Sequence, residues 1–357
     1  MRCNSKMKKD TNFIYLLRFI AAFLVVINHY SPVRNALVNN GGEAVSFFFL
    51  LSGFILVVAY EKQIMQNNLA SLAFYIKRIA RIYPLYLLAL LLTLTYHFLV
   101  HNGHSHLMFK LPFELGMVQT WLFPGAINYP DWSISCEFFF YLLFPLYVLK
   151  LKDMRLHSAV LLAVILLIVT MSLSYLFNSY AIASVRVDLK EGYLYQHPIV
   201  RFPVFFWGNV LGFLYIKNLR IPSRSLILML LAGCLFVFLW TFKPVTFGLS
   251  LKQVGLLLIY TVLIIVLLQK EAFSLKYLNS KWFVLLGDIS YGVYLLQFPI
   301  SSFVLIYTNN FNTWQNFAIF SIILIGVSFL VHEYFEKPLR SKIVATYNQS
   351  RVSESFS

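Results

Sequence analysis

The stretch SAVLLAVILLIVTMSLSYLF, residues 158–177, contains twenty residues and no charged side chain. An α-helix needs about 20 apolar residues to cross the hydrocarbon core of a bilayer, so this stretch predicts a membrane-spanning helix. Strands of a membrane barrel are instead short segments of alternating polarity. The fold class is therefore predicted to be all-α, in a chain that crosses a membrane.

Comparable apolar runs recur along the chain, and they predict about ten transmembrane helices. The predicted helices span residues 13–31, 44–60, 82–100, 134–150, 158–177, 199–216, 226–242, 253–269, 284–306 and 316–334. There is no sign of an internal repeat or of a second domain. We expect one membrane domain over residues 1–340 and a polar cytoplasmic tail over 341–357, disordered from residue 347 onward.

The composition supports a polytopic membrane protein. Of the 357 residues, 59% are hydrophobic and 12% are charged, whereas soluble domains contain roughly a quarter charged residues. This composition argues against soluble enzymes and nucleic-acid-binding proteins, although the net charge is +15. The three cysteines are too few for a disulfide framework and match no metal-binding spacing.

The positive charges predict the orientation in the membrane. With the N-terminus inside, 22 of the 29 basic residues fall in cytoplasmic segments, as the positive-inside rule requires. Both termini are therefore predicted to be cytoplasmic. Lys6, Lys8 and Lys9 precede the first apolar run, which we interpret as a retained signal anchor because no small-residue cleavage site follows it.

The first predicted helix contains Arg18 and, eleven residues later, His29. Eleven residues place both side chains on one helix face, ~16 Å apart along the axis. Such groups are costly in a membrane helix unless they line a pocket or a wet cavity, and histidine is a natural general base near neutral pH. The alternative is that Arg18 extends to the cytoplasmic headgroups while His29 caps the far end.

Two further sets of polar residues stand out. Arg78 and Arg81 are three residues apart, so both guanidinium groups project the same way and suit phosphate oxygens; an ordinary positive-inside cluster is the alternative. Glu137 lies one turn after Ser133 in an apolar helix. A carboxylate there must be paired, protonated or functional, so it is predicted to orient His29, to hold an arginine or to accept a proton.

Other polar residues carry less weight. Ser290, Tyr294 and Gln297 recur at helical spacing, which interhelical hydrogen bonds explain, with acceptor binding as the second interpretation. Four histidines lie near the first long exterior loop, at His97, His101, His104 and His106. No cysteine or carboxylate is closely interleaved with them, so we expect a solvated loop and no metal site.

Taken in order, several motifs resemble the integral-membrane acyltransferase family 3. The matching stretches are LRFIAA at 17–22 continuing to His29, FFLLSGF at 48–54, RIARIYP at 78–84, Trp121, and WSISCEFFFYLLFP at 132–145. The resemblance covers roughly residues 12–340. It departs from the family at Gln297, where many members have a histidine, and we assign this amide no catalytic role.

The resemblance implies an O-acyltransferase of the bacterial inner membrane. Its members acylate polysaccharides, lipopolysaccharide such as O-antigen, peptidoglycan and some small molecules. The implied donor is acyl-CoA, most often acetyl-CoA, with no tightly bound cofactor. The implied acceptor is a hydroxyl of a cell-surface polysaccharide or lipid-linked glycan, and membrane lipid is the remaining partner.

Specific residues are expected to carry this chemistry. The expected catalytic residues are His29, Arg18 and Glu137; those for the donor are Arg78 and Arg81; those for substrate are Trp132, Ser133 and Tyr291. His29 would act as general base or as acyl carrier. Because His29 lies toward the exterior and the two donor arginines inside, the acyl group is expected to pass across the membrane.

Two other functions would also use many helices and basic loops. A transporter or flippase for a lipid-linked sugar would usually show internal repeats or matching pairs of broken helices. A polysaccharide polymerase predicts a large exterior catalytic loop, longer than the segments near 101–131 and 178–198. The modified sugar, the size of the acyl group and the oligomeric state stay open.

Overall fold

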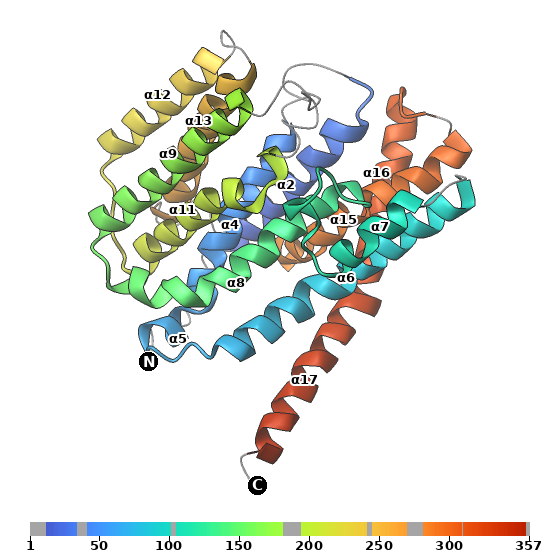
Figure 1. The fold of residues 1–357 in the computed structure, drawn as a ribbon, viewed down its shortest axis with the longest axis horizontal. Helices are drawn as coiled ribbons and strands as arrows, with labels where there is room; N and C mark the ends of the chain where they lie inside the picture. Colours follow the sequence, from blue (N-terminus) through green and yellow to red (C-terminus); the bar gives the residue numbers. More distant parts are fainter. Residues whose placement is uncertain are drawn as a thin grey trace.

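The fold is a bundle of α-helices (Figure 1). The computed structural model describes residues 12–33, 41–100, 105–180, 194–240, 245–269, 281–308 and 310–354. These residues form helices and connecting turns, and no strand occurs among them. The predicted all-α class is therefore confirmed.

Eleven of the helices in these ranges are long. They are α2 (Asn12–Tyr30), α4 (Ala44–Ala59), α6 (Ser71–Val100), α8 (Trp132–Asp153), α9 (Leu156–Tyr180), α11 (Pro198–Ile216), α12 (Ser223–Trp240), α13 (Val245–Gln269), α15 (Lys281–Thr308), α16 (Trp314–Val331) and α17 (Lys337–Glu354). Short elements connect them: α5 (Glu61–Met65), α7 (Ser105–Leu115), three 3₁₀ turns (Gly41–Glu43, Gln119–Trp121 and Tyr129–Asp131) and a π-helical turn (His332–Glu336).

Each of the ten predicted apolar runs lies on a helix. In the described ranges, seven helical segments are long and apolar enough to cross a membrane. Three shorter apolar helices coincide with α4 and with parts of α12 and α13. The protein is thus a multi-pass membrane protein by length and composition, but the count of ten spans is not confirmed.

Two helices differ from the sequence prediction. The prediction began the third helix at residue 82, whereas α6 begins at Ser71 and therefore contains Arg78 and Arg81 in its interior. Lysine and arginine lower the hydropathy of this segment but are good helix formers, so the helix extends past the apolar run. The tail was predicted to be disordered from residue 347, yet α17 continues to Glu354.

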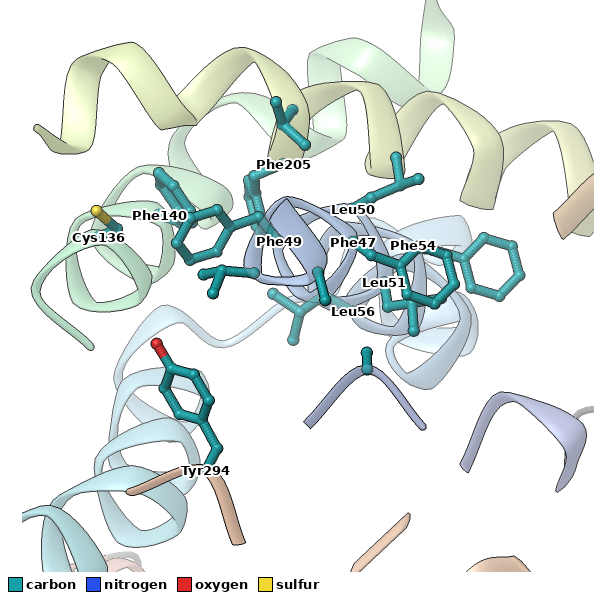
Figure 2. Close-up of a cluster of buried hydrophobic side chains, with 14 of the residues drawn as sticks. Phe47, Phe49, Leu50, Leu51, Phe54, Leu56, Cys136, Phe140, Phe205 and Tyr294 are labelled. Atoms are coloured by element: carbon teal, nitrogen blue, oxygen red, sulfur yellow. The ribbon is translucent and has the colours of Figure 1, made fainter. Parts of the chain in front are cut away.

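Helix α4 lies in the core and packs most extensively against α11. Aromatic rings fill the space around it, and Figure 2 shows Phe49 and Phe140 close to Phe205. The ring centroids of Phe49 and Phe140 are 5.2 Å apart, and those of Phe140 and Phe205 are 4.8 Å apart. The central packing is therefore largely aromatic.

Glycines allow α4 and α11 to approach closely. A Cβ atom at Gly53 would collide with the backbone of Phe205, and one at Gly208 would collide with the backbone of Leu50. Small residues at a membrane helix contact permit this separation. This contact holds α4 in place, and one face of α4 forms a wall of the candidate site.

Polar contacts join the connecting segments at the two ends of the bundle. At one end, Lys152 donates to Asn67 and Lys217 donates to the Lys152 carbonyl, at 2.6 and 2.7 Å. At the other end, Lys252 forms a buried ion pair with Glu43 at 3.2 Å. The first group belongs to segments predicted to be cytoplasmic and the second to segments predicted to be exterior. The predicted signal-anchor lysines lie outside the described residues.

Candidate active site

A polar pocket lies between α2, α4, α6, α8 and α15. Aromatic and aliphatic side chains of α4 form one wall. The polar lining residues are Arg18, Ser52, Arg78, Arg81, Ser133, Glu137, Tyr141, Tyr291 and Tyr294.

Glu137 is held in the pocket by its own helix. Tyr141, one turn further along α8, donates its hydroxyl hydrogen to Glu137 Oε2 at 3.1 Å. The Tyr141 oxygen also lies 3.4 Å from the Ser52 hydroxyl of α4. This chain of hydrogen bonds fixes the carboxylate on the pocket wall.

Three arginines surround this one carboxylate. Arg18, Arg81 and Arg78 all lie within electrostatic range of Glu137. Fully ionised, these four groups give the pocket an excess of two positive charges. Such a site attracts an anionic ligand, because guanidinium groups form strong charge-assisted hydrogen bonds with phosphate and carboxylate oxygens.

Arg78 is braced by aromatic residues. Its guanidinium group lies 5.3 Å from the centroid of the Tyr60 ring, and Nη2 donates to the Tyr60 hydroxyl at 3.3 Å. Its Nε atom is buried and has no hydrogen-bond partner in the described part of the chain. Arg78 therefore retains a buried donor that a ligand could use.

His29 lies outside the pocket lining, paired with Gln297. The distance from His29 Nδ1 to Gln297 Oε1 is 3.0 Å. The amide is oriented by a second bond, in which Gln297 Nε2 donates to the Tyr294 carbonyl at 2.7 Å. Since Oε1 can only accept, this contact requires the hydrogen on Nδ1.

Helix α15 connects the pocket to His29. Tyr291 and Tyr294 line the pocket, and Gln297 follows one turn later. Three residues correspond to a rise of about 4.5 Å in an α-helix. His29 is therefore roughly one helical turn beyond the pocket, on the side predicted to face the exterior.

The loop before α8 lies beside His29. Asn128 donates to Asp131 Oδ1 at 2.7 Å and to the Leu295 carbonyl of α15 at 3.1 Å. The Tyr294 hydroxyl donates to the Pro130 carbonyl at 3.2 Å. With the loop fixed in this way, the Tyr129 ring packs edge-on against His29, with centroids 5.1 Å apart.

Glu114, at the end of α7, anchors the other part of this loop. Its side chain is fully buried. It accepts hydrogen bonds from the Ile127 backbone N–H at 2.7 Å and from the Tyr86 hydroxyl at 3.1 Å. Burial raises the pKa of Glu114 to about 7, although both hydrogen bonds oppose the shift.

The structure brings together most of the predicted site residues. The pocket contains Arg18, Arg78, Arg81, Ser133, Glu137 and Tyr291. His29 and Trp132 are not part of its lining. Trp132 is buried, with its ring 6.0 Å from that of Phe49 and 5.8 Å from the Arg201 guanidinium group.

The partner of His29 differs from the one considered at first. Orientation of His29 by Glu137 was one predicted role, but Glu137 hydrogen-bonds to Tyr141 and the histidine pairs with Gln297. The amide that received no role in the sequence analysis is thus the group that sets the histidine tautomer. The sequence signal for Gln297 was its place in a row of polar residues at helical spacing, after Ser290 and Tyr294.

Arg201 is a buried polar group that was not singled out from the sequence. Arg201 is 1% exposed, stacks on the Tyr195 ring at 3.8 Å and donates to Ser46 at 3.3 Å. Of the four loop histidines, His101 and His104 lie outside the described residues, so the expected absence of a metal site there stays a prediction.

These features define a multi-pass α-helical membrane protein with a cationic site buried among its helices. The family model described as an acyltransferase domain matches residues 11–333, nearly the whole chain. The protein therefore belongs to this acyltransferase family, integral-membrane acyltransferase family 3, as the motif resemblance indicated.

Named relatives agree with this assignment. The chain is 40% identical over 116 residues to acyltransferase MdmB of Streptomyces mycarofaciens, a match that covers 30% of this chain and 28% of the relative. It is 29% identical over 262 residues to a protein of Acidianus two-tailed virus named "Putative acetyltransferase ORF330", covering 71% and 72% of the two chains. No solved structure matches the chain.

Proposed function

We propose that this membrane acyltransferase moves an acyl group, which we infer to be acetyl, from acyl-CoA to a hydroxyl of a cell-surface polysaccharide or lipid-linked glycan. The observation that carries the proposal is the cationic pocket one helical turn from a histidine of fixed tautomer. The family supplies the acyl-transfer chemistry. The two named relatives are an acyltransferase and a proposed acetyltransferase.

The histidine suits the role of general base. An alcohol is a poor nucleophile until a base takes its proton. In the proposed reaction, His29 Nε2 removes the hydroxyl proton while the hydroxyl oxygen attacks the thioester carbonyl carbon. The C–S bond breaks, the ester forms, and the proton passes from His29 to the departing CoA sulfur. Gln297 holds Nε2 in the acceptor state that this step needs.

The arginines suit the donor, whose nucleotide portion carries several phosphate charges. Arg78 and Arg81 lie on α6, near the end of the bundle predicted to face the cytoplasm, where acyl-CoA is made. Arg18 lies deeper in the pocket, on the path to His29, and would neutralise donor charge there. Glu137 and Tyr141 would keep these guanidinium groups in place.

The arrangement also favours transfer across the membrane. Arg18 and His29 are eleven residues apart on α2, which corresponds to ~16 Å along a helix axis. The thin pantetheine arm of CoA suits a path of this length. We propose that the acceptor meets the acyl group on the outer side, near Tyr129, in the bacterial plasma membrane.

The acetyl content of the surface glycan tests the proposed function in cells. A deletion strain is complemented with the wild-type gene, with His29→Ala, or with His157→Ala. His157 is an exposed histidine at the start of α9, far from His29 in the sequence. Base-labile acetyl groups on the glycan should appear with the wild-type protein and with His157→Ala, and should be lost with His29→Ala at equal protein abundance.

Two results would count against the proposal. One is normal acetylation by the His29→Ala protein. The other is a deletion strain in which glycan length or export fails while the acetyl content per sugar stays unchanged, because a flippase would produce that result.

A further inference from the structure

A second concave site lies beside the pocket, at the end of the bundle where α6 begins. It is an open groove between α6 and α17 with about 930 Å³ of empty space. The charged residues that line it are Lys77, Arg78, Lys337 and Arg340, and we call it the basic groove. All four are cations, and no acidic residue is part of the lining.

One face of α17 forms half of the groove. Each contributing residue has another three or four positions away; they are Lys337, Arg340, Ser341, Val344, Ala345 and Asn348. This spacing places them on a single helix face. Helix α17 leaves the bundle next to α6 (Figure 1), so this face lies opposite Lys77 and Arg78.

The cations of the groove are poorly neutralised within the protein. Lys337 forms one ion pair, with Glu333 one turn earlier, at 3.0 Å and with Lys337 61% exposed. Arg340 senses the charges of Glu336 and Asp288, but also those of Arg78 and Arg81. Lys77 and Arg340 form no hydrogen bond or salt bridge within the described ranges. Four converging cations with so little compensation favour a multiply charged anion.

Arg78 belongs to both sites. It lines the basic groove and also the inner pocket that contains Arg18 and Glu137. A single ligand can therefore place a charged head in the groove and a thin arm in the pocket, passing Arg78 on the way.

Resting on the function proposed above, we propose that the basic groove binds the phosphorylated nucleotide end of the acyl-CoA donor. Lys337 and Arg340 of α17, together with Lys77, would bind its ribose phosphate and diphosphate, while Arg78 marks the entry of the pantetheine arm into the pocket. Helix α17, most of which was predicted to belong to a polar tail over 341–357, thereby becomes part of the donor site. Its role is donor affinity and specificity, and the bond-making groups lie elsewhere.

The same phosphate chemistry occurs in anionic lipid headgroups. A lipid site would not distinguish between acyl donors that differ only in their nucleotide end. A donor site would distinguish them, because the lost contacts belong to one part of the molecule.

Three acetyl donors of decreasing charge test the inference with purified full-length protein in phosphatidylcholine nanodiscs. They are acetyl-CoA, acetyl-dephospho-CoA, which lacks the ribose phosphate, and acetyl-pantetheine, which lacks the nucleotide. Wild-type protein is compared with Lys337→Gln, Arg340→Gln and the double variant. Lys342→Gln removes a charge from an exposed position of α17 outside the groove and is the matched control.

The double variant should raise KM for acetyl-CoA about tenfold or more, with kcat within about twofold, because two charge-assisted phosphate contacts are lost. The increase should be smaller with acetyl-dephospho-CoA and absent with acetyl-pantetheine. Lys342→Gln should behave as wild type with all three donors.

Several outcomes would overturn the inference. An unchanged KM for acetyl-CoA in the double variant excludes the groove as a donor site, and so does an equal rise with acetyl-pantetheine. A defect seen only after phosphatidylglycerol is added to the nanodiscs would assign the groove to lipid. If wild-type protein turns over none of the three donors, the proposed function itself fails. If it turns them over but the groove variants have the wild-type KM, only the inference about the groove fails.

Discussion

The hydrogen bond between His29 and Gln297 joins two side chains that are 268 positions apart in the chain. Each is unremarkable alone, since a membrane helix can end in a histidine and can contain a glutamine. Together they define the protonation of the ring, because an amide oxygen fixed by its own N–H bond to the Tyr294 carbonyl leaves Nδ1 as the donor. The amide at position 297 thus orients the histidine ring.

Replacing Gln297 with leucine tests this pairing. The Gln297→Leu protein should keep its fold but lose at least about tenfold in kcat, because His29 is no longer held with Nε2 as acceptor. Ser290→Ala is the control, since among the residues that the structure describes the Ser290 hydroxyl bonds only to the Gly287 carbonyl of its own helix. Steady-state acetyl transfer by the purified proteins measures the effect, and equal kcat values for wild type and Gln297→Leu would contradict the assignment.

Glu114 gives stability a pH dependence. Its pKa is raised by burial from 4.5 to about 7, so the folded protein prefers the protonated acid. The stabilisation is fully present below the unfolded pKa and is lost as the pH rises through about 7. A shift of this size corresponds to about 3 kcal/mol between the two protonation states.

The Glu114→Gln variant should therefore flatten the pH profile of stability. Between about pH 5 and pH 8, the Tm of the wild-type protein in detergent should fall more steeply than that of the variant. The variant keeps a side-chain oxygen for the Ile127 N–H, so it should fold. Parallel profiles for the two proteins would show that Glu114 does not titrate in this range.

Among the helices, α4 and α11 depend most on close packing. The backbones meet at Gly53 and Gly208, each of which lies against the other helix. A valine at Gly208 has to push α11 away from α4, and overpacking of this kind costs about 3 kcal/mol or more. Because α4 forms a wall of the pocket, the change would also disturb the site.

The comparison of Gly208→Val with Gly326→Val isolates this effect. Gly326 lies in α16, where an added Cβ would meet no atom within 4 Å. Both variants make the same helix substitution, so their intrinsic propensities match. Size-exclusion profiles and melting in detergent should show loss of folded protein for Gly208→Val only. Equal Tm values for the two variants would mean that the helices can separate at no cost.

Helix positions followed well from hydropathy, whereas helix ends did not. In a bilayer, the backbone of a long apolar run such as 158–177 has to satisfy its hydrogen bonds within a helix. Helix α9 spans this run, from Leu156 to Tyr180. Where α6 and α17 continue beyond the apolar region, a water-exposed helix carries no such signal. The extensions contain Arg78 and Lys337, so the basic groove could not be predicted from the apolar runs.

The site was predictable in part. Charged residues in apolar helices are so costly that their presence alone indicated Arg18 and Glu137, and the pocket contains both. The pairing of Glu137 with Tyr141, and of His29 with Gln297, depended on how helices rotate against one another. Spacing along one helix does not contain that information.

Considered as a complete bundle, the protein has its basic groove toward one end and His29 toward the other, with the cationic pocket between them. Sealed inside-out membrane vesicles test transfer across this distance. Labelled acetyl-CoA added outside, at the cytoplasmic face, should yield acetyl esters that an added esterase reaches only after the membrane is permeabilised. Esters that the esterase removes from intact vesicles would place the transfer on the cytoplasmic side.

Acyl transfer by the isolated protein tests most directly whether these buried groups make an ester. Purified protein in nanodiscs is given acetyl-CoA labelled in the acetyl group and surface glycan from the deletion strain. Wild-type protein should form base-labile labelled ester on the glycan, and His29→Ala should lower the rate at least about a hundredfold, as loss of a general base requires. Ester formation by His29→Ala at the wild-type rate, or none by the wild-type protein, would contradict the proposed mechanism.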